Sequence, residues 1–143
     1  SRLDLEYLAR RKQLDNVFFR DYYPSEIYPS LVKSADLGII SLSKENHTPI
    51  VPGKLVGYMA GGLPIVAMIN KESTDLMRII DESQCGKYVI DGDSQMFAKK
   101  IEELLSSSEM LLEHKRNALD YVERFFSVET AARTIEELSE REE

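Results

Sequence analysis

The chain has 143 residues, of which 43% are hydrophobic and 30% charged, and its formal net charge is −7. This length suits one domain with its own core, and no apolar run approaches the roughly 18 residues that a membrane-spanning helix requires. An acidic chain without a basic stripe argues against nucleic acid as a partner. The opening residues lack the apolar segment of a signal peptide, and the single cysteine, Cys85, is expected to be buried and structural. A reducing, cytoplasmic location is therefore expected.

The first third of the chain predicts helix, strand, helix and strand. Residues 2–14 favour a helix, and the β-forming "NVFF" at residues 16–19 predicts a short strand. Start signals at residues 24–25 precede a short helix over residues 26–35, in which Pro29 suits only the first turn. The nearly continuous apolar run from residue 37 to residue 42 predicts a strand that is covered on both faces, as in a parallel sheet.

The middle and the end of the chain continue this alternation. A polar loop at residues 43–52 leads into a helix that begins at Pro52. A buried strand is predicted at residues 63–69, and a strand that ends in a turn at residues 86–93. Between them lies an amphipathic helix with Ser73 as its N-cap. Residues from about 94 to 143 predict helices only. Strands alternating with helices predict a single domain over residues 1–143, of the α/β class, with a parallel sheet and right-handed crossovers.

The loop at residues 43–52 is the candidate ligand loop. Ligands of open α/β sheets bind at the carboxyl ends of the strands, and this longest strand-to-helix loop ends in Pro-Gly-Lys. The free amides of a first helical turn, the helix dipole and a lysine ammonium together suit a diphosphate. The residues predicted to bind it are Val51, Pro52, Gly53, Lys54 and Leu55. The local pattern alone is more typical of an ordinary helix start with Lys54 in solvent, and the spacing of a P-loop is absent.

The order of several segments resembles a known family. In chain order these are "NVFFRDYYP", "LVKSADLGIISLS", "PGKLVGYMAGGLPIVA", "CGKYVIDGD" and "FFSVETAARTIEEL". Together they resemble the C-terminal donor-binding domain of retaining, GT-B-fold glycosyltransferases of the group 1 family, from about Asp15 to Leu138. The piece "IVPGKL" resembles the Pro-Ser-Lys variant in enzymes that assemble O-antigen and colanic acid.

The resemblance implies a Rossmann-like sheet and a nucleoside-diphosphate sugar as substrate. It also implies a glycan or glycolipid acceptor, bound through an N-terminal domain that is absent here, and a role in surface polysaccharide or lipopolysaccharide synthesis. The full-length enzyme would act in the cytoplasm or at the inner face of the membrane, and the chain alone is expected to be inactive. No cofactor and no metal are expected; His47, Cys85 and His114 have no metal-ligand spacing.

The resemblance also implies roles for single residues, with two departures. Backbone near Asp21 and Tyr22 would contact the base, whereas no catalytic residue is identified. The family's pair of glutamates falls on Pro49 and Gly57, so a ribose contact at Gly57 could use only backbone. Glu45 is the candidate to replace the missing glutamates, but a solvated loop charge is the favoured interpretation for it and for His47.

The second departure concerns the sheet. The family's first two strands have no counterpart in this sequence, which predicts a gap between residues 16–19 and 37–42 and an N-terminally truncated domain. Strand exchange with a second copy is the alternative that would fill the gap. Two other function classes stay open: a non-catalytic α/β interaction module, of receiver-like or flavodoxin-like type, and a fragment of a nucleotide-sugar epimerase.

Overall fold

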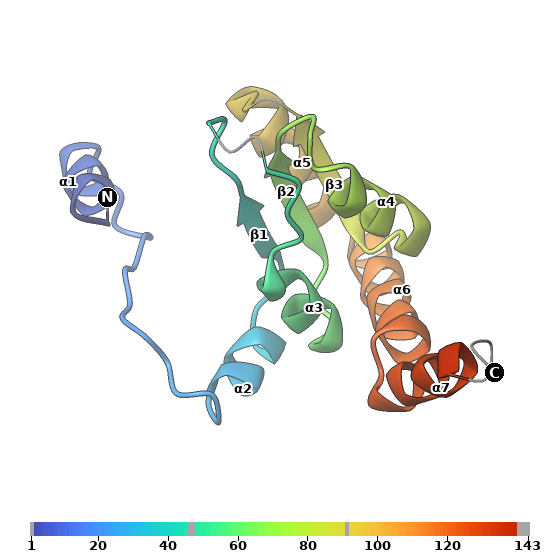
Figure 1. Cartoon of the computed structure of the whole chain (residues 1–143). Coiled ribbons are helices and arrows are strands. Elements are labelled where there is room, and N and C mark those ends of the chain that lie inside the picture. Colours follow the sequence, from blue (N-terminus) through green and yellow to red (C-terminus); the bar gives the residue numbers. More distant parts are fainter. Residues whose placement is uncertain (1, 46–47, 91, 140–143) are drawn as a thin grey trace.

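The computed structural model describes residues 2–45, 48–90 and 92–139 (Figure 1). Within these residues three parallel strands form one sheet in the order β1-β2-β3, which confirms the expected α/β class. The strands are β1 (Gly38–Ser41), β2 (Ile65–Ile69) and β3 (Gly86–Ile90). The helices are α1 (Arg2–Arg11), α2 (Tyr28–Lys33), α3 (Gly53–Ala60), α4 (Thr74–Ser83), α5 (Ser94–Leu105), α6 (Ser108–Phe125) and α7 (Val128–Ser139).

The central strand β2 is covered on both faces, as its unbroken apolar sequence predicts. Right-handed crossovers place α3 and α4 on one face of the sheet, where α6 packs against both of them. Helix α5 contacts β2 and β3 and covers the other face. The core under α3, α4 and α6 is one cluster of buried residues: Ile40, Leu55, Met59, Ile65, Ala67, Ile69, Leu76, Ile79, Ile80, Cys85 and Ala118.

The edge strand β1 is covered on one face only, so the expectation of two covered faces is wrong. Gly38 and Ile40 are buried, whereas the side chain of Ile39, which points to the opposite face, is 44% exposed. Helix α5, which covers this face of the sheet, packs on β2 and β3 and leaves the Ile39 side of β1 uncovered.

The backbone of β1 is also open along its outer edge. The amides of Gly38 and Leu42 donate to carbonyls of the β2 segment, at 2.8 and 2.9 Å. Because backbone groups alternate along a strand, those of Ile39 and Ser41 point away from β2. Among the described strands none lies on that side.

The strand expected at residues 16–19 is not formed. Residues 17–24 have no regular secondary structure, and α1 with this segment stands apart from the sheet on the β1 side (Figure 1). A strand needs a neighbour that accepts its backbone hydrogen bonds, and none of the described strands lies beside residues 16–19. The described sheet is therefore limited to three strands, in line with the expected lack of two family strands.

The two helix starts with an expected serine cap differ in whether the serine hydroxyl caps the helix. Ser127 accepts a hydrogen bond from the amide of Thr130 at 3.1 Å, as an N-cap does. Ser73 occupies the expected N-cap position of α4, but its hydroxyl makes no cap bond. It donates instead to Oδ1 of Asn70 at 2.5 Å.

Up to Ser139 the C-terminal part is helical as expected, with α5, α6 and α7 following one another after β3, and residues 140–143 lie outside the described residues. Each of α5 and α6 begins with a side-chain cap, since Asp93 accepts from the amide of Met96 and Ser107 from that of Met110. None of the helices in the described part of the chain is both long and apolar enough to cross a bilayer.

Candidate functional site

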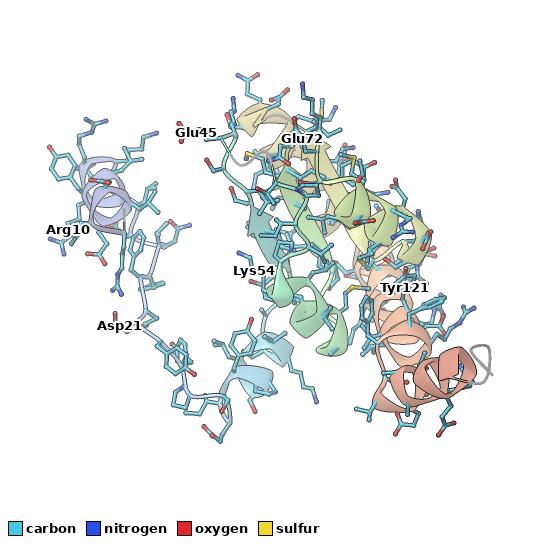
Figure 2. The ribbon with its side chains drawn as sticks, viewed as in Figure 1. Arg10, Asp21, Glu45, Lys54, Glu72 and Tyr121 are labelled. Atoms are coloured by element: carbon cyan, nitrogen blue, oxygen red, sulfur yellow. The ribbon has the colours of Figure 1, made fainter. Side chains whose placement is uncertain are left out.

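Segments from all three strands meet at the carboxyl ends of the sheet. Nδ2 of Asn70, just after β2, donates to the carbonyl of Ser43, just after β1, at 3.4 Å. Lys44 lies over Gly92, which follows β3, so closely that a β-carbon at Gly92 would collide with it. Gly92 has φ +72°, a conformation that favours glycine. Figure 2 shows Glu45 at this end of the sheet as well.

Helix α3 begins one residue later than the sequence predicted. Pro52 is the N-cap residue, with φ −63° and ψ 132°, and the helix begins at Gly53. Proline fits the N-cap because its fixed φ suits an extended approach to the helix. The prediction that Pro52 occupies the first helical position is therefore wrong by one residue.

The first turn of α3 offers fewer free amides than the sequence suggested. Pro52 has no amide hydrogen, and the amide of Leu55 already donates to the carbonyl of Pro52 at 2.9 Å. The amides of Gly53 and Lys54 have no acceptor among the described residues, since no side chain caps this helix. A β-carbon at Gly53 would meet no heavy atom within 4 Å, so the approach to these amides is open.

The side chains of this turn divide between core and solvent. Leu55 and Met59 are fully buried and fix α3 against the sheet, and burial of each contributes about 2 kcal/mol. Lys54 is exposed, and no carboxylate in the described part of the chain forms an ion pair with it. Val51, just before the helix, is 36% exposed. Residues 51–55 thus combine the buried Leu55, which anchors the helix, with the exposed Lys54 ammonium and the two backbone amides of Gly53 and Lys54, which have no described acceptor.

The structure uses Gly57 for packing inside the fold. Its carbonyl accepts the amide of Gly61 at 3.1 Å, and a β-carbon at Gly57 would lie 3.7 Å from the ring of Tyr28 on α2. Its backbone is thereby engaged within α3, and its Cα faces another helix. The ribose contact at Gly57 stays a prediction without geometric support.

The predicted base-binding residues lie far from α3. The carboxylate of Asp21 pairs with Arg2 on α1, and Tyr22 is 88% exposed. In Figure 2, Asp21 lies on the segment that stands apart from the sheet, well away from Lys54. The structure therefore brings residues 51–57 together but does not bring Asp21 and Tyr22 to them.

The loop after β1 gives no replacement for the family's glutamates among the described residues. Glu45 is exposed, and its amide donates to Oγ of Ser43 at 3.3 Å. Pro49 is exposed, and His47 lies outside the described residues. In the view of Figure 2, Glu45 and Lys54 lie toward opposite ends of β1.

The remaining candidate ligands of a metal are dispersed. Cys85 is fully buried in the core, and this burial raises the pKa of its thiol, as suits a structural cysteine. His114 is buried between α6 and the end of α4. No three His, Cys, Asp or Glu side chains gather in a metal-binding group within residues 2–45, 48–90 and 92–139.

A hollow of about 600 Å³ lies between α1 and residues 13–20, with Arg2, Arg10 and Arg20 among its lining residues. Its walls belong to the segment that stands apart from the sheet (Figure 1). This hollow is a weaker candidate than the start of α3, because none of the described residues that line it belongs to the sheet or to a helix packed on the sheet.

Sequence reasoning missed two residues at the carboxyl ends, Asn70 and Lys44. Asn70 is only 3% exposed, and its partner Ser43 is 27 residues away in sequence. An asparagine directly after a buried strand was the available signal. No sequence signal indicates the contact of Lys44 with Gly92, because it joins the loop after β1 to the loop after β3.

Comparisons with known proteins identify the family. The family described as "Glycosyl transferases group 1" matches residues 2–107. The fold is similar to the C-terminal domain of a glycosyl transferase group 1 family protein (LpcC) from Francisella tularensis, with a TM-score of 0.69 and 22% identity. That similarity covers 89% of this chain and 63% of the other, and no curated protein matches. The chain therefore belongs to the glycosyl transferase group 1 family.

Proposed function

We propose that the chain is the donor-binding half of a glycosyltransferase, which moves a sugar from a nucleoside-diphosphate sugar to a glycan or glycolipid acceptor. Membership of the family supports sugar transfer. The observation that carries the donor role is the start of α3. There the amides of Gly53 and Lys54 and the Lys54 ammonium, which have no partner among the described residues, adjoin the positive end of the helix dipole.

Each group at this turn has a role in the proposed reaction. When the bond between the sugar and the diphosphate breaks, negative charge develops on the leaving phosphate oxygens. The two amides and Lys54 would stabilise that charge, and the buried Leu55 holds them in place so that no reorganisation is needed during the step. This scheme requires no cofactor, and the acceptor would bind in another domain.

The acidic net charge of −7 does not oppose a phosphate at this position. Exposed charges more than about 8 Å apart are largely screened at physiological salt. The amides and ammonium of the first α3 turn would act within hydrogen-bonding distance. The local donors therefore outweigh the distributed surface charge.

The proposal extends to a biological setting. The similarity of "IVPGKL" to the Pro-Ser-Lys variant supports assembly of a surface polysaccharide such as O-antigen, colanic acid or lipopolysaccharide. The full-length enzyme would then work in the cytoplasm or at the inner face of the membrane. Family membership favours this function over an interaction module or an epimerase fragment.

The test is a titration of the chain with UDP, GDP and their sugars, followed by backbone amide shifts. One nucleotide should perturb residues 51–55, and Lys54→Ala should weaken its binding at least about tenfold, because a charge-assisted phosphate contact is lost. Lys99→Ala, which removes an exposed lysine from α5, is the matched control and should bind normally. A folded sample in which no nucleotide shifts residues 51–55 would contradict the donor role.

A further inference from the structure

A second hollow, of about 440 Å³, lies at the amino end of the edge strand β1, between α2 and α3. Its volume falls within the range of about 300–1,000 Å³ that is usual for the pockets of small ligands. Most of its lining is apolar and includes Leu31, Val32, Leu37, Ile39 and Leu63. Such a lining favours a ligand with an apolar surface.

Two tyrosine rings also line this hollow, Tyr28 from α2 and Tyr58 from α3. A β-carbon at Gly38 would lie 2.6 Å from the Tyr58 ring, so the glycine lets the ring lie directly against the backbone of β1. Burial and the neighbouring Tyr28 both raise the pKa of Tyr58, which agrees with two phenols that share one hollow. Aromatic rings stack on other flat rings, so the hollow suits a flat, aromatic ligand.

The edge of β1 adds hydrogen-bonding groups to this apolar surface. Ile39 lines the hollow, its backbone amide and carbonyl point away from β2, and none of the described strands lies beside them. An amide donor next to a carbonyl acceptor complements a base edge, because uracil and guanine each present a carbonyl beside a ring N–H. A few fixed polar groups in an apolar pocket are the usual means of orienting a ligand.

The hollow adjoins the turn that we propose to bind the diphosphate. Lys54 and Tyr58 are four residues apart on α3, so their side chains lie on the same face of the helix, about 6 Å apart along its axis. In the view of Figure 2, Lys54 lies toward the amino end of β1, where the hollow lies. A ligand whose phosphates contact Gly53 and Lys54 can therefore extend along α3 and place its other end in the hollow.

We infer that this hollow binds the base of the donor nucleotide: the base stacks on the Tyr58 ring and pairs with the backbone of Ile39, while the ribose spans the interval to the first turn of α3. This position replaces the one predicted at Asp21 and Tyr22, which lie far from that turn. The inference rests on the proposed function, because it names the base subsite of the same donor site.

The first experiment compares inorganic pyrophosphate with the nucleoside diphosphate that binds the native chain, UDP or GDP. Both should shift the backbone amides of residues 53–54, because both carry the diphosphate. Only the nucleotide should also shift the amides of residues 37–39, because only the nucleotide has a base to place in the hollow.

The second experiment removes the stacking surface. Tyr58→Leu keeps an apolar side chain without an aromatic face, and nucleotide affinity should fall about tenfold while pyrophosphate affinity stays as it is. Tyr58→Phe keeps the ring and should restore most of the lost affinity. Tyr7→Leu, which removes an exposed tyrosine from α1, is the matched control and should bind the nucleotide normally.

The outcomes separate this inference from the proposed function. A nucleotide that shifts residues 51–55 but not residues 37–39 overturns the base subsite and leaves the donor role intact. Equal losses of pyrophosphate and nucleotide affinity in Tyr58→Leu also overturn it, because the variant would then act through α3 as a whole. If neither pyrophosphate nor any nucleotide shifts residues 51–55 of the native chain, the proposed function fails, and the base subsite fails with it.

Discussion

Nδ1 of His114, on α6, lies 2.5 Å from the carbonyl oxygen of Gln84, at the end of α4. Gln84 has a left-handed backbone, with φ 51° and ψ 34°, which ends α4 and leaves its carbonyl to an outside donor. Because a carbonyl can only accept, Nδ1 carries the proton and donates it. His114 is 6% exposed, so this hydrogen bond joins α6 to the end of α4 in the interior of the protein.

Replacing His114 by leucine should lower the free energy of unfolding by about 1–3 kcal/mol, because the buried side chain then no longer donates to the Gln84 carbonyl. Urea denaturation measures the change. Asn117→Ala is the matched control, since Nδ2 of Asn117 donates to the same carbonyl at a longer 3.3 Å, and it should cost less. A His114→Leu variant as stable as the native chain would show that this bond contributes nothing.

Gly86→Ala should prevent stable folding. Gly86 pairs with Ile65 in the sheet, and a β-carbon at Gly86 would collide with the carbonyl of Ile65. The obstacle is backbone, so relief requires the two strands to separate, and we expect a loss of more than about 3 kcal/mol. Thermal melting by circular dichroism tests this. A variant that melts within a few degrees of the native chain contradicts the geometry.

Gly53→Ala should have the opposite effect on stability. A β-carbon at Gly53 meets no atom, and alanine favours the helix, so stability should stay equal or rise by about 0.5–1 kcal/mol. The same methyl group would obstruct a ligand that approaches the free amides, and nucleotide affinity should fall. Calorimetric titration alongside thermal melting separates the two effects. Unchanged affinity would show that the ligand does not approach over Gly53.

Cys85 should make stability fall at alkaline pH. Burial raises the pKa of the Cys85 thiol, so the folded chain holds this proton more tightly than the unfolded chain does. The resulting stabilisation is complete below the unfolded pKa of about 8.5 and is lost as the pH rises through the folded value. Unfolding titrations at pH 7.5 and 9.5 should differ less in Cys85→Ala than in the native chain. Rapid alkylation of Cys85 in the folded protein would contradict its burial.

The fold was predictable where short-range pattern and tertiary packing agree. The unbroken apolar run of β2 predicts a buried strand, and the structure confirms it, whereas β3 forms as a strand but is only partly buried. Residues 16–19 have the composition of a strand but no neighbour, and composition cannot report whether a neighbour exists. The exposure of Ile39 was equally unpredictable, because it depends on which strands α5 covers, and the sequence of β1 carries no information on that.

The candidate site was predictable in its local part. Pro-Gly-Lys correctly indicated a helix start after the loop at residues 43–52, whereas the hydrogen bond of the Leu55 amide could be seen only in the geometry of the turn. The bonds from Asn70 to Ser43 and from His114 to Gln84 join residues about 30 positions apart. Such contacts follow from the packing of whole elements, and no periodicity in the sequence marks them.

The open edge of β1 has a consequence for handling the protein in solution. The backbone groups of Ile39 and Ser41 meet no strand in the described part of the chain, and with the exposed Ile39 side chain they form a template for pairing with another strand. At about 0.01 M salt the net charge of −7 keeps molecules apart over a screening length of about 30 Å, which shrinks to about 8 Å at physiological ionic strength. Concentrated samples should therefore stay monodisperse longest in dilute buffer, and added salt should promote self-association along β1.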